Sequence, residues 1–274
     1  MDDLLRPLRC PLCQGPLTAT EAGLRCPNRH TFDRARAGYV SFRVGRGGGV
    51  EGDSAAMVAA RLTFLEAGHY APLTAALVAL APATGQLVEV GAGPAWHLAR
   101  VLDARPGLVA VALDVSKAAA RRAARAHPRL IAVVADAHQP LPLATGCADL
   151  VLNVFAPRHG AELRRILAPG GRLVVVVPEA AHLAALRAPL GLLAVDPQKG
   201  ARVAATLAAF VCKSSESLAW TLDLSRAEAH ALAAMGPAGH HDPEGLARRA
   251  AALPDRVQAT AAVRVEVWVA AQEV

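Results

Sequence analysis

The chain has few aromatic residues and no long apolar segment. Phe, Trp and Tyr make up 4% of its 274 residues while 53% are hydrophobic, so small and aliphatic side chains must form most of the core. Arg, Asp or Pro interrupts the apolar runs well before the roughly 18 residues that a membrane-spanning helix needs. The opening Met-Asp-Asp-Leu-Leu-Arg lacks the basic start and apolar stretch of a secretory signal. We therefore expect a cytoplasmic protein without a membrane segment.

Lysine is also scarce, and arginine provides nearly all of the positive charge. Only three of the 29 Lys and Arg residues are lysines, and the formal net charge is +6. Arginine suits bidentate phosphate contacts and stacking, which makes nucleic acid a natural partner, although a GC-rich genome would favour arginine as well. The five cysteines fit this compartment better as metal ligands or free thiols than as disulfides.

Two close pairs of metal-binding residues stand near the N-terminus. Cys10-Pro-Leu-Cys13 and Cys26-Pro-Asn-Arg-His30 are separated by twelve residues. Each pair bends back on a tight turn and presents two ligands, as a tetrahedral zinc site requires. Four protein ligands leave no open position for water, so we predict a structural Zn²⁺ site in a stretch too short to fold without metal. A chance spacing is the alternative.

Aromatic residues alternate with arginines around and after these ligands. Phe32, Tyr39 and Phe42 are interleaved with Arg29, Arg34, Arg36, Arg43 and Arg46. Such a surface is suited to RNA, while the aromatic rings could equally pack under the zinc module; both can hold. The glycine-rich segment 45–52 follows and predicts a linker. We therefore divide the chain into a zinc-binding, RNA-recognition module over residues 1–45 and a larger domain over residues 46–274.

A glycine turn follows a short apolar run in Leu87-Val-Glu-Val-Gly-Ala-Gly-Pro-Ala-Trp-His-Leu-Ala-Arg100. Gly91 and Gly93 remove Cβ atoms where a ligand approaches the backbone, and the next helix points its free N–H groups there. Glu89 lies within the predicted strand, and a carboxylate there is costly unless a cationic or hydrogen-bonding ligand meets it. The pattern predicts a nucleotide-type binding turn; a structural turn in an unrelated α/β domain is the alternative.

Strands and helices alternate after this turn, which predicts an α/β fold with a parallel sheet. Gly107–Asp114 and Arg129–Asp136 are expected strands, with a helix over Ser116–His127 between them. Each strand ends in a carboxylate, and such ends of parallel strands face one crevice. Asp114 is therefore placed to bind ribose hydroxyls, and Asp136 with Ala137 to meet an adenine. A helix cap or turn is the alternative role for each acid.

The rest of the chain continues the alternation. A helix is expected from Asp53 or Ser54 to Ala67, and segment 185–212 is expected to be mostly helical. Ser225-Arg-Ala-Glu228 is a capping box for a helix reaching Met235. Further elements are expected as strands over Asp149–Phe155, Leu173–Val177, Ser215–Leu224 and Thr260–Ala270, and as a helix over Glu162–Leu167.

Five short motifs occur in one particular order. They are Cys10-Pro-Leu-Cys13, Cys26-Pro-Asn-Arg-His30-Thr-Phe-Asp33, Gly38-Tyr39-Val40, Gly52-Asp53-Ser54 and Phe64-Leu65-Glu66-Ala67-Gly68-His69-Tyr70. This order resembles that of the ribosomal large-subunit RNA guanine-N1 methyltransferases of the RlmA type, and the resemblance extends over most of the chain. It implies an α/β, Rossmann-like class I S-adenosylmethionine-dependent methyltransferase domain with an N-terminal zinc-ribbon module.

The resemblance also implies roles for individual residues. S-adenosylmethionine is expected against Tyr70, Glu89, Gly91, Gly93, Pro94, Ala95, Asp114, Asp136, Ala137 and His182. Pro94 replaces the acidic or small residue that is more usual there, and we expect it to narrow the approach of the cofactor. The catalytic pocket for the target base is expected at Asn153, Phe155 and Pro157, with Tyr70 and Trp96 as stacking surfaces. No general base can be identified, and water is a sufficient proton acceptor.

The function implied is transfer of a methyl group to N1 of a guanine in a 23S rRNA hairpin. The family includes housekeeping enzymes that act at nucleotide 745 and enzymes of macrolide resistance that act at nucleotide 748. The Ala- and Arg-rich composition indicates a high-GC bacterium and favours 748. The family also suggests a homodimer whose two ribbons form an RNA cleft.

Two other functions remain open at this point. One is a zinc-ribbon RNA-binding protein whose methyltransferase fold is degenerate, against which Glu89, Gly91, Gly93 and Asp114 argue. The other is a methyltransferase for a small molecule, with the ribbon as a lid, against which the arginine-rich ribbon argues.

Overall fold

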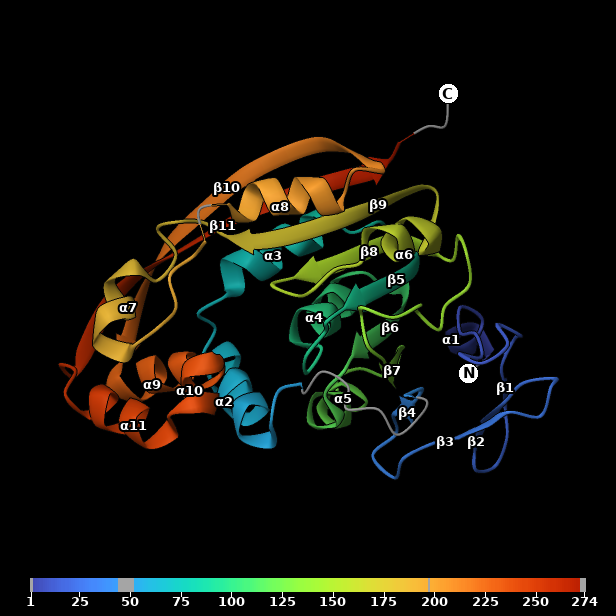
Figure 1. The fold of residues 1–274 in the computed structure, drawn as a ribbon, viewed down its shortest axis with the longest axis horizontal. Coiled ribbons are helices and arrows are strands. Elements are labelled where there is room, and N and C mark those ends of the chain that lie inside the picture. The colour runs from blue at the N-terminus through green and yellow to red at the C-terminus, as the bar shows by residue number, and fades with distance from the viewer. Residues whose placement is uncertain (1, 44–51, 197, 272–274) are drawn as a thin grey trace.

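An eight-stranded sheet forms the centre of the structure, a computed structural model that describes residues 2–43, 52–196 and 198–271 (Figure 1). Its strand order is β10-β11-β9-β8-β5-β6-β7-β4. The six strands β9, β8, β5, β6, β7 and β4 run parallel to one another. Strand β11 pairs with β9 in the antiparallel direction, and β10 pairs with β11 in the same way at the edge of the sheet. The strands are β4 (Val40–Ser41), β5 (Thr84–Val90), β6 (Gly107–Asp114), β7 (Leu130–Val134), β8 (Ala148–Val154), β9 (Leu167–Pro178), β10 (Phe210–Ser225) and β11 (Arg256–Ala270). The order reverses at β5, and such a switch point opens a crevice at the carboxyl ends of the strands.

Helices cover both faces of this sheet. They are α1 (Asp2–Leu5), α2 (Ala55–Glu66), α3 (Ala71–Leu80), α4 (Trp96–Ala104), α5 (Lys117–Ala123), α6 (Gly160–Ile166), α7 (Ala184–Leu190), α8 (Lys199–Thr206), α9 (Arg226–Ala234), α10 (Pro237–His241) and α11 (Pro243–Ala251). Successive strand residues point to opposite faces, so Leu87 and Val88 of β5 belong to two separate apolar clusters. Buried residues of α2–α5, α7, α9 and α11 complete one cluster, and those of α1, α6 and α8 complete the other. No helix in the described part of the chain combines the length and apolarity that a membrane crossing requires.

The N-terminal ribbon is a small three-stranded sheet at one end of the molecule, opposite α9–α11 (Figure 1). It consists of β1 (Thr18–Ala19), β2 (Gly23–Arg25) and β3 (Thr31–Asp33). Its buried residues Leu8, Leu24 and Phe42 share a cluster with Val88 of the central sheet. β4 lies just after the ribbon and pairs with β7 in parallel, so residues 40–41 extend the larger sheet. The predicted linker, apart from Gly52, lies outside the described residues, and the division at residue 45 stays a prediction.

Most predicted elements are present, and the differences have local causes. The strand Gly107–Asp114 has the predicted bounds, and Ser225 and Glu228 form the predicted capping box at α9. The predicted helix over Ser116–His127 ends four residues earlier, at Ala123. Segment 185–212 is not mostly helical: α7 and α8 are short helices, and β10 begins at Phe210 because residues 210–212 pair with 268–270 of β11.

Candidate functional site

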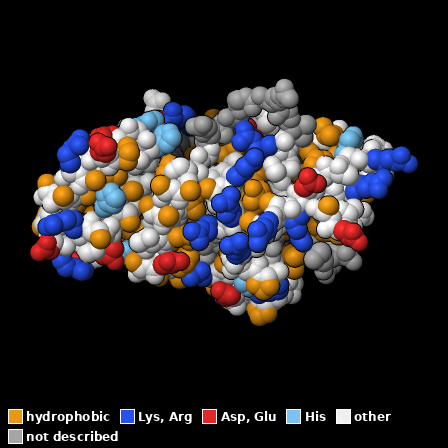
Figure 2. All heavy atoms as spheres, turned by 90° about the horizontal axis from the view of Figure 1, so that it is seen from below, with side chains coloured by type: hydrophobic (Ala, Val, Ile, Leu, Met, Phe, Trp, Pro, Cys, Tyr) orange, Lys and Arg blue, Asp and Glu red, His pale blue; other side chains and the backbone are white. Residues whose placement is uncertain are grey.

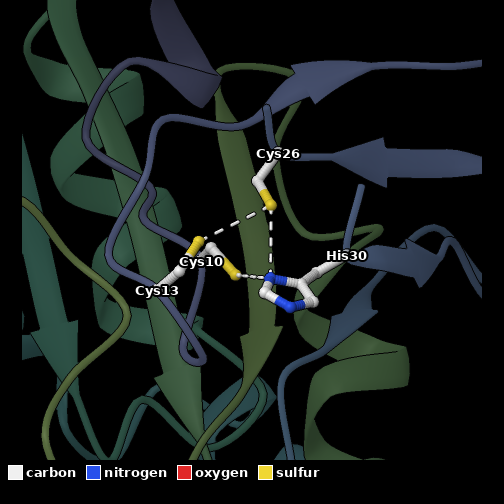
Figure 3. A group of neighbouring side chains, drawn as sticks. All are labelled: Cys10, Cys13, Cys26 and His30. Atoms are coloured by element: carbon white, nitrogen blue, oxygen red, sulfur yellow. Dashed lines mark hydrogen bonds between the residues drawn. The ribbon is translucent and has the colours of Figure 1, made fainter. Parts of the chain in front are cut away.

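The ribbon brings the four predicted zinc ligands together. Cys10 and Cys13 lie on the turn before β1, and Cys26 and His30 lie on the turn between β2 and β3, so the side chains converge from two turns (Figure 3). All four ligand atoms lie within 4.8 Å of one another. His30 Nδ1 is 3.4 Å from the Sγ atoms of Cys10 and Cys26, and the Sγ atoms of Cys13 and Cys26 are 3.6 Å apart. Bonds of about 2.0–2.3 Å from a tetrahedral Zn²⁺ give ligand separations of about 3.5–3.8 Å, so the cluster fits this ion.

The backbone of the first turn favours a thiolate ligand. A hydrogen bond from the backbone at Gly15, the largest contribution, lowers the pKa of Cys13 to about 6. Cys10 and Cys26 are buried, and burial raises the pKa of Cys10. A zinc ion stabilises the thiolate of Cys13, whose pKa is lowered, and that of Cys10, whose pKa is raised, because the metal binds the deprotonated sulfur. The cluster therefore has the donor set and the geometry of a closed, structural metal site.

A cavity of about 550 Å³ opens at the carboxyl ends of β5, β6, β7 and β8, where the switch point predicts it. Nearly all of the predicted cofactor residues line it: Tyr70, Glu89, Gly91, Gly93, Pro94, Asp114, Asp136, Ala137 and His182. Ala95 does not line it. This residue is fully buried at the N-cap of α4 in a left-handed conformation (φ 59°), and its predicted role in cofactor binding stays a prediction.

Glycine stands at positions 91 and 93 of the turn for different structural reasons. Gly91 has φ +75°, and a Cβ there would lie 2.3 Å from the Cβ of Ala156 in the loop after β8. Any side chain at this position would therefore push the target loop away from the cofactor turn. Gly93 has φ +55°, a Cβ there would lie 3.8 Å from Cδ of Arg61, and its N–H donates to Asp114 Oδ2 over 2.8 Å. The turn is thus held open toward the cavity.

Asp114 holds the turn through both of its carboxylate oxygens. Its Oδ1 accepts from Ser116 N–H and its Oδ2 from Gly93 N–H, each over 2.8 Å. Burial raises its pKa, although these two backbone donors act in the opposite direction. Each carboxylate oxygen keeps a second lone pair for a ribose hydroxyl. The predicted ligand role and the alternative turn role are therefore compatible in one side chain.

Glu89 is a buried carboxyl group that lacks a partner. It is 2% exposed, and its Oε2 has no hydrogen-bond partner among the described residues. Burial, assisted by the nearby charge of Asp114, raises its pKa to about 8. A positively charged ligand in the cavity would reverse this effect, because an opposite charge favours the carboxylate. The orphaned oxygen fits the sulfonium and ammonium groups of S-adenosylmethionine.

An aromatic group borders the other side of the cavity. The ring centroid of Phe155 lies 6.3 Å from that of Tyr70 and 5.9 Å from that of His182. The Tyr70 hydroxyl is 3.4 Å from His182 Nε2, and His182 Nδ1 accepts from Ala262 N–H over 3.2 Å. Phe155 is 37% exposed, has φ 53° and lines the cavity. These rings can stack on a planar base.

Asn153 occupies a different place from the predicted one. It is fully buried, lies outside the cavity lining, and its amide donates to the carbonyls of Val90 (3.2 Å) and Pro157 (2.8 Å). Its Oδ1 accepts from Arg158 Nε over 2.9 Å. Asn153 therefore positions the loop from outside the cavity lining, and its predicted catalytic role stays a prediction. Phe155 and Pro157 line the cavity, and their catalytic role stays a prediction.

Arg61 and Asp53 also line the cavity, although neither was predicted to bind the cofactor. Arg61 of α2 pairs with Asp53 over 2.7 Å and donates to the Met235 carbonyl, and both charged side chains line the cavity. No spacing in α2 sets Arg61 apart from a solvated arginine, because only the packing of α2 against α9 brings it there. Trp96 lines the cavity as predicted, but Arg100 covers its ring, with Cζ 3.1 Å from the centroid.

Comparison with known proteins agrees with this geometry. A family model described as RlmA, N-terminal, matches residues 8–42, and one described as a methyltransferase domain matches residues 88–175. Among solved structures, the YcgJ protein from Bacillus subtilis has a TM-score of 0.51 at 13% identity (73% of this chain, 98% of that chain). A chain of the Haloferax volcanii complex of the Trm112 activator with a methyltransferase has a TM-score of 0.54 at 21% identity (81% and 100%). Fold and site thus define a Rossmann-like, class I S-adenosylmethionine-dependent methyltransferase with an N-terminal zinc ribbon.

Two curated relatives narrow this class. The 23S rRNA (guanine(748)-N(1))-methyltransferase of Streptomyces fradiae is 47% identical over 269 residues (95% of this chain, 96% of the relative). A protein of Micromonospora griseorubida, provisionally named a 23S rRNA (guanine-N(1)-)-methyltransferase, is 49% identical over 287 residues (96% and 97%). The chain belongs to the 23S rRNA (guanine-N1)-methyltransferase family. Its cofactors are S-adenosylmethionine, which supplies an activated methyl group, and Zn²⁺.

Proposed function

We propose that this protein methylates N1 of guanine 748 in a hairpin of 23S rRNA and thereby contributes to macrolide resistance. The observation that supports this proposal most strongly is 47% identity over almost the full length to the S. fradiae guanine-748 enzyme. The aromatic border of the cavity supports a planar base as the substrate. Because the proposed substrate is rRNA, we assign the protein to the cytoplasm.

In this proposal, side chains at the cavity bind and orient S-adenosylmethionine. In our proposal Asp114 binds the ribose hydroxyls, and Asp136 with Ala137 contacts the adenine. Glu89 faces the positive charge of the methionine part. Pro94 lines the cavity beside the two glycines and, with Tyr70 and His182, limits the space in which the methyl group can lie. Holding the methyl group in one position aligns it with the target atom, which lowers the entropic part of the reaction barrier.

The target half requires an extruded guanine. N1 of guanine bears a proton and faces its pairing partner, so the base must leave any stack before transfer. Phe155 and Tyr70 offer surfaces for the flipped base, and Pro157 closes the loop beside them. When bound, S-adenosylmethionine would supply its methyl group to guanine N1, and the N1 proton would leave to water.

A basic surface beside the ribbon supports an RNA partner. Gly38 lies against α5, because a Cβ there would be 3.4 Å from the Cβ of Ala124. The loop and the helix therefore form one surface, whose exposed arginines are Arg34, Arg36, Arg121, Arg122 and Arg125. None of them forms an ion pair with a described carboxylate. Figure 2 shows Lys and Arg side chains gathered in the middle of this lower face of the molecule.

We further propose the division into an RNA-recognition module (1–45) and a methyltransferase domain (46–274), and a homodimer in which two ribbons form the RNA cleft. Sedimentation at working concentration tests the dimer, since an active monomer excludes a shared cleft. The base assignment is tested with a synthetic hairpin and labelled S-adenosylmethionine, followed by nucleoside mass spectrometry. We expect 1-methylguanosine from the hairpin with guanine 748 and none when adenine replaces it. Cofactor binding without any RNA methylation would favour a small-molecule substrate.

A further inference from the structure

A second cavity, of about 450 Å³, adjoins the cofactor cavity and is rich in arginine. The two cavities share His182, Leu183, Leu192 and Leu193 in their linings. Three arginines from separate elements line the second cavity: Arg158 after β8, Arg187 in α7 and Arg202 in α8. Asp196 is the one carboxylate among its described lining residues, and it pairs with Arg202. Arg158 and Arg187 therefore form no ion pair with a described lining residue, and Glu266, outside the lining, is the carboxylate whose charge acts on Arg158.

Arg158 is held rigidly at the boundary between the cavities. Its Nε donates to Asn153 Oδ1 over 2.9 Å, and its Nη2 donates to the Ala156 carbonyl over 3.3 Å. Both acceptors are neutral, and no described carboxylate lies within ion-pair distance. Burial lowers the pKa of this guanidinium, so its position disfavours the charge it bears. The fully buried Asn153 thus orients an arginine that forms no ion pair in the described chain, while the charge of Glu266, which pairs with Arg264, acts on it from a greater distance.

Arg187 faces the same cavity from α7. Its Nη2 donates to the carbonyls of Ala180 (2.5 Å) and His182 (2.9 Å), and its Nε is buried without a hydrogen-bond partner. A guanidinium with an unused, buried donor gains most from a ligand that accepts several hydrogen bonds. Arg158 and Arg187 approach the cavity from two elements, which is the arrangement that binds a tetrahedral anion.

We propose that this arginine cavity binds the phosphate group next to the target guanosine. The inference rests on the proposed RNA methylation, since it assigns the backbone of the same nucleotide. Phe155, where the base is expected, stands three residues before Arg158 in one loop, and the cavities share a wall. A base that enters the first cavity leaves its ribose and phosphate at this wall. Holding that phosphate would compensate for the loss of stacking when the base is extruded.

The experiment compares Arg158→Gln, Arg187→Gln and the control Arg248→Gln, an exposed arginine of α11 that lines neither cavity. Each protein is assayed on two hairpins, one natural and one with neutral methylphosphonate linkages on both sides of the target guanosine. For the wild type we expect KM for RNA to rise on the order of tenfold with the neutral hairpin. Arg158→Gln and Arg187→Gln should show the raised KM on both hairpins, with an unchanged Kd for S-adenosylmethionine. The control should behave as the wild type.

Two results would overturn the inference: a wild-type KM that is the same on the natural and the neutral hairpin, or Gln variants whose KM on the neutral hairpin rises above that of the wild type on that hairpin. Arg158→Lys keeps the charge and should restore part of the KM, which separates anion binding from a purely structural role. Calorimetric binding of guanosine 5′-monophosphate, guanosine and the hairpin distinguishes a phosphate on RNA from a free nucleotide, since a monophosphate that binds as tightly as the hairpin would point to a free nucleotide and overturn the RNA assignment. Absence of methylation of the natural hairpin by the wild type would instead refute the proposed function.

Discussion

Glu89 should release a proton when the cofactor binds. In the cofactor-free protein burial raises its pKa to about 8, so at pH 7 only about one molecule in ten has the carboxylate. A sulfonium and an ammonium group beside the orphaned Oε2 favour the ionised form. Ionising the group at pH 7 then costs about 1.4 kcal/mol of binding free energy, a cost that disappears as the pH rises past 8. Affinity for S-adenosylmethionine should therefore strengthen about tenfold between pH 7 and pH 9.

Calorimetry in two buffers of different ionisation enthalpy measures this proton directly. At pH 7 the wild type should release about 0.9 proton more per bound cofactor than Glu89→Gln, which keeps the shape of the side chain but cannot ionise. The amino group of the cofactor titrates in both proteins and cancels in the comparison. Equal proton release by the two proteins, or equal pH dependence of their affinities, would refute the interpretation of Glu89 as the counter-charge of the cofactor.

The same raised pKa predicts a stability effect in the absence of cofactor. Because the pKa of Glu89 is higher in the folded than in the unfolded protein, its favourable contribution is complete below pH 4.5 and is lost as the pH rises through about 8. Glu89→Gln should therefore raise the Tm of the cofactor-free protein at pH 8 and have little effect at pH 4.5. A lower Tm for the variant at pH 8 would contradict the sign.

Three further variants test the metal site, the cofactor site and the basic surface. The purified protein should contain about one zinc per chain, and Cys13→Ala should abolish zinc binding and expose residues 9–33 to hydrogen exchange; fully protected, metal-free ribbon amides would contradict this. Asp114→Ala should weaken S-adenosylmethionine binding by about 1.5–3 kcal/mol, because charge-assisted hydrogen bonds are lost; unchanged calorimetric affinity would show that the ribose lies elsewhere. Replacing Arg34, Arg36 and Arg121 with Gln together should raise the KM for RNA and flatten its salt dependence while cofactor affinity is unchanged; an unaltered salt slope would exclude this surface.

Local patterns were sufficient to predict the central sheet and the metal ligands. Gly107–Asp114 is apolar throughout and ends in an acid, so both its bounds and the place of its carboxylate follow from the sequence. The zinc ligands follow from spacing because each pair lies on a single tight turn. The glycine at position 91 could be predicted to lie at a close approach, and the structure identifies the approaching atom as Ala156 Cβ.

Features that depend on distant packing could not be predicted in the same way. Asn153 has the residue type of a catalytic loop, and only the positions of Val90 and Pro157 show that its amide is fully occupied. Arg61 reaches the cavity through the packing of α2 against α9. Its hydrogen bond to the carbonyl of Met235, 174 residues later in the chain, shows this packing. β4 is two residues long, too short for any periodicity, and its place in the sheet is set by β7.

Primer extension on 23S rRNA tests the central claim most directly. A methyl group on guanine N1 blocks Watson–Crick pairing and halts reverse transcriptase at the neighbouring nucleotide. After incubation with the protein and S-adenosylmethionine, we predict a new stop next to nucleotide 748 that is absent without the cofactor. A stop next to nucleotide 745, or no stop in a sample with proven cofactor binding, would contradict the proposed function.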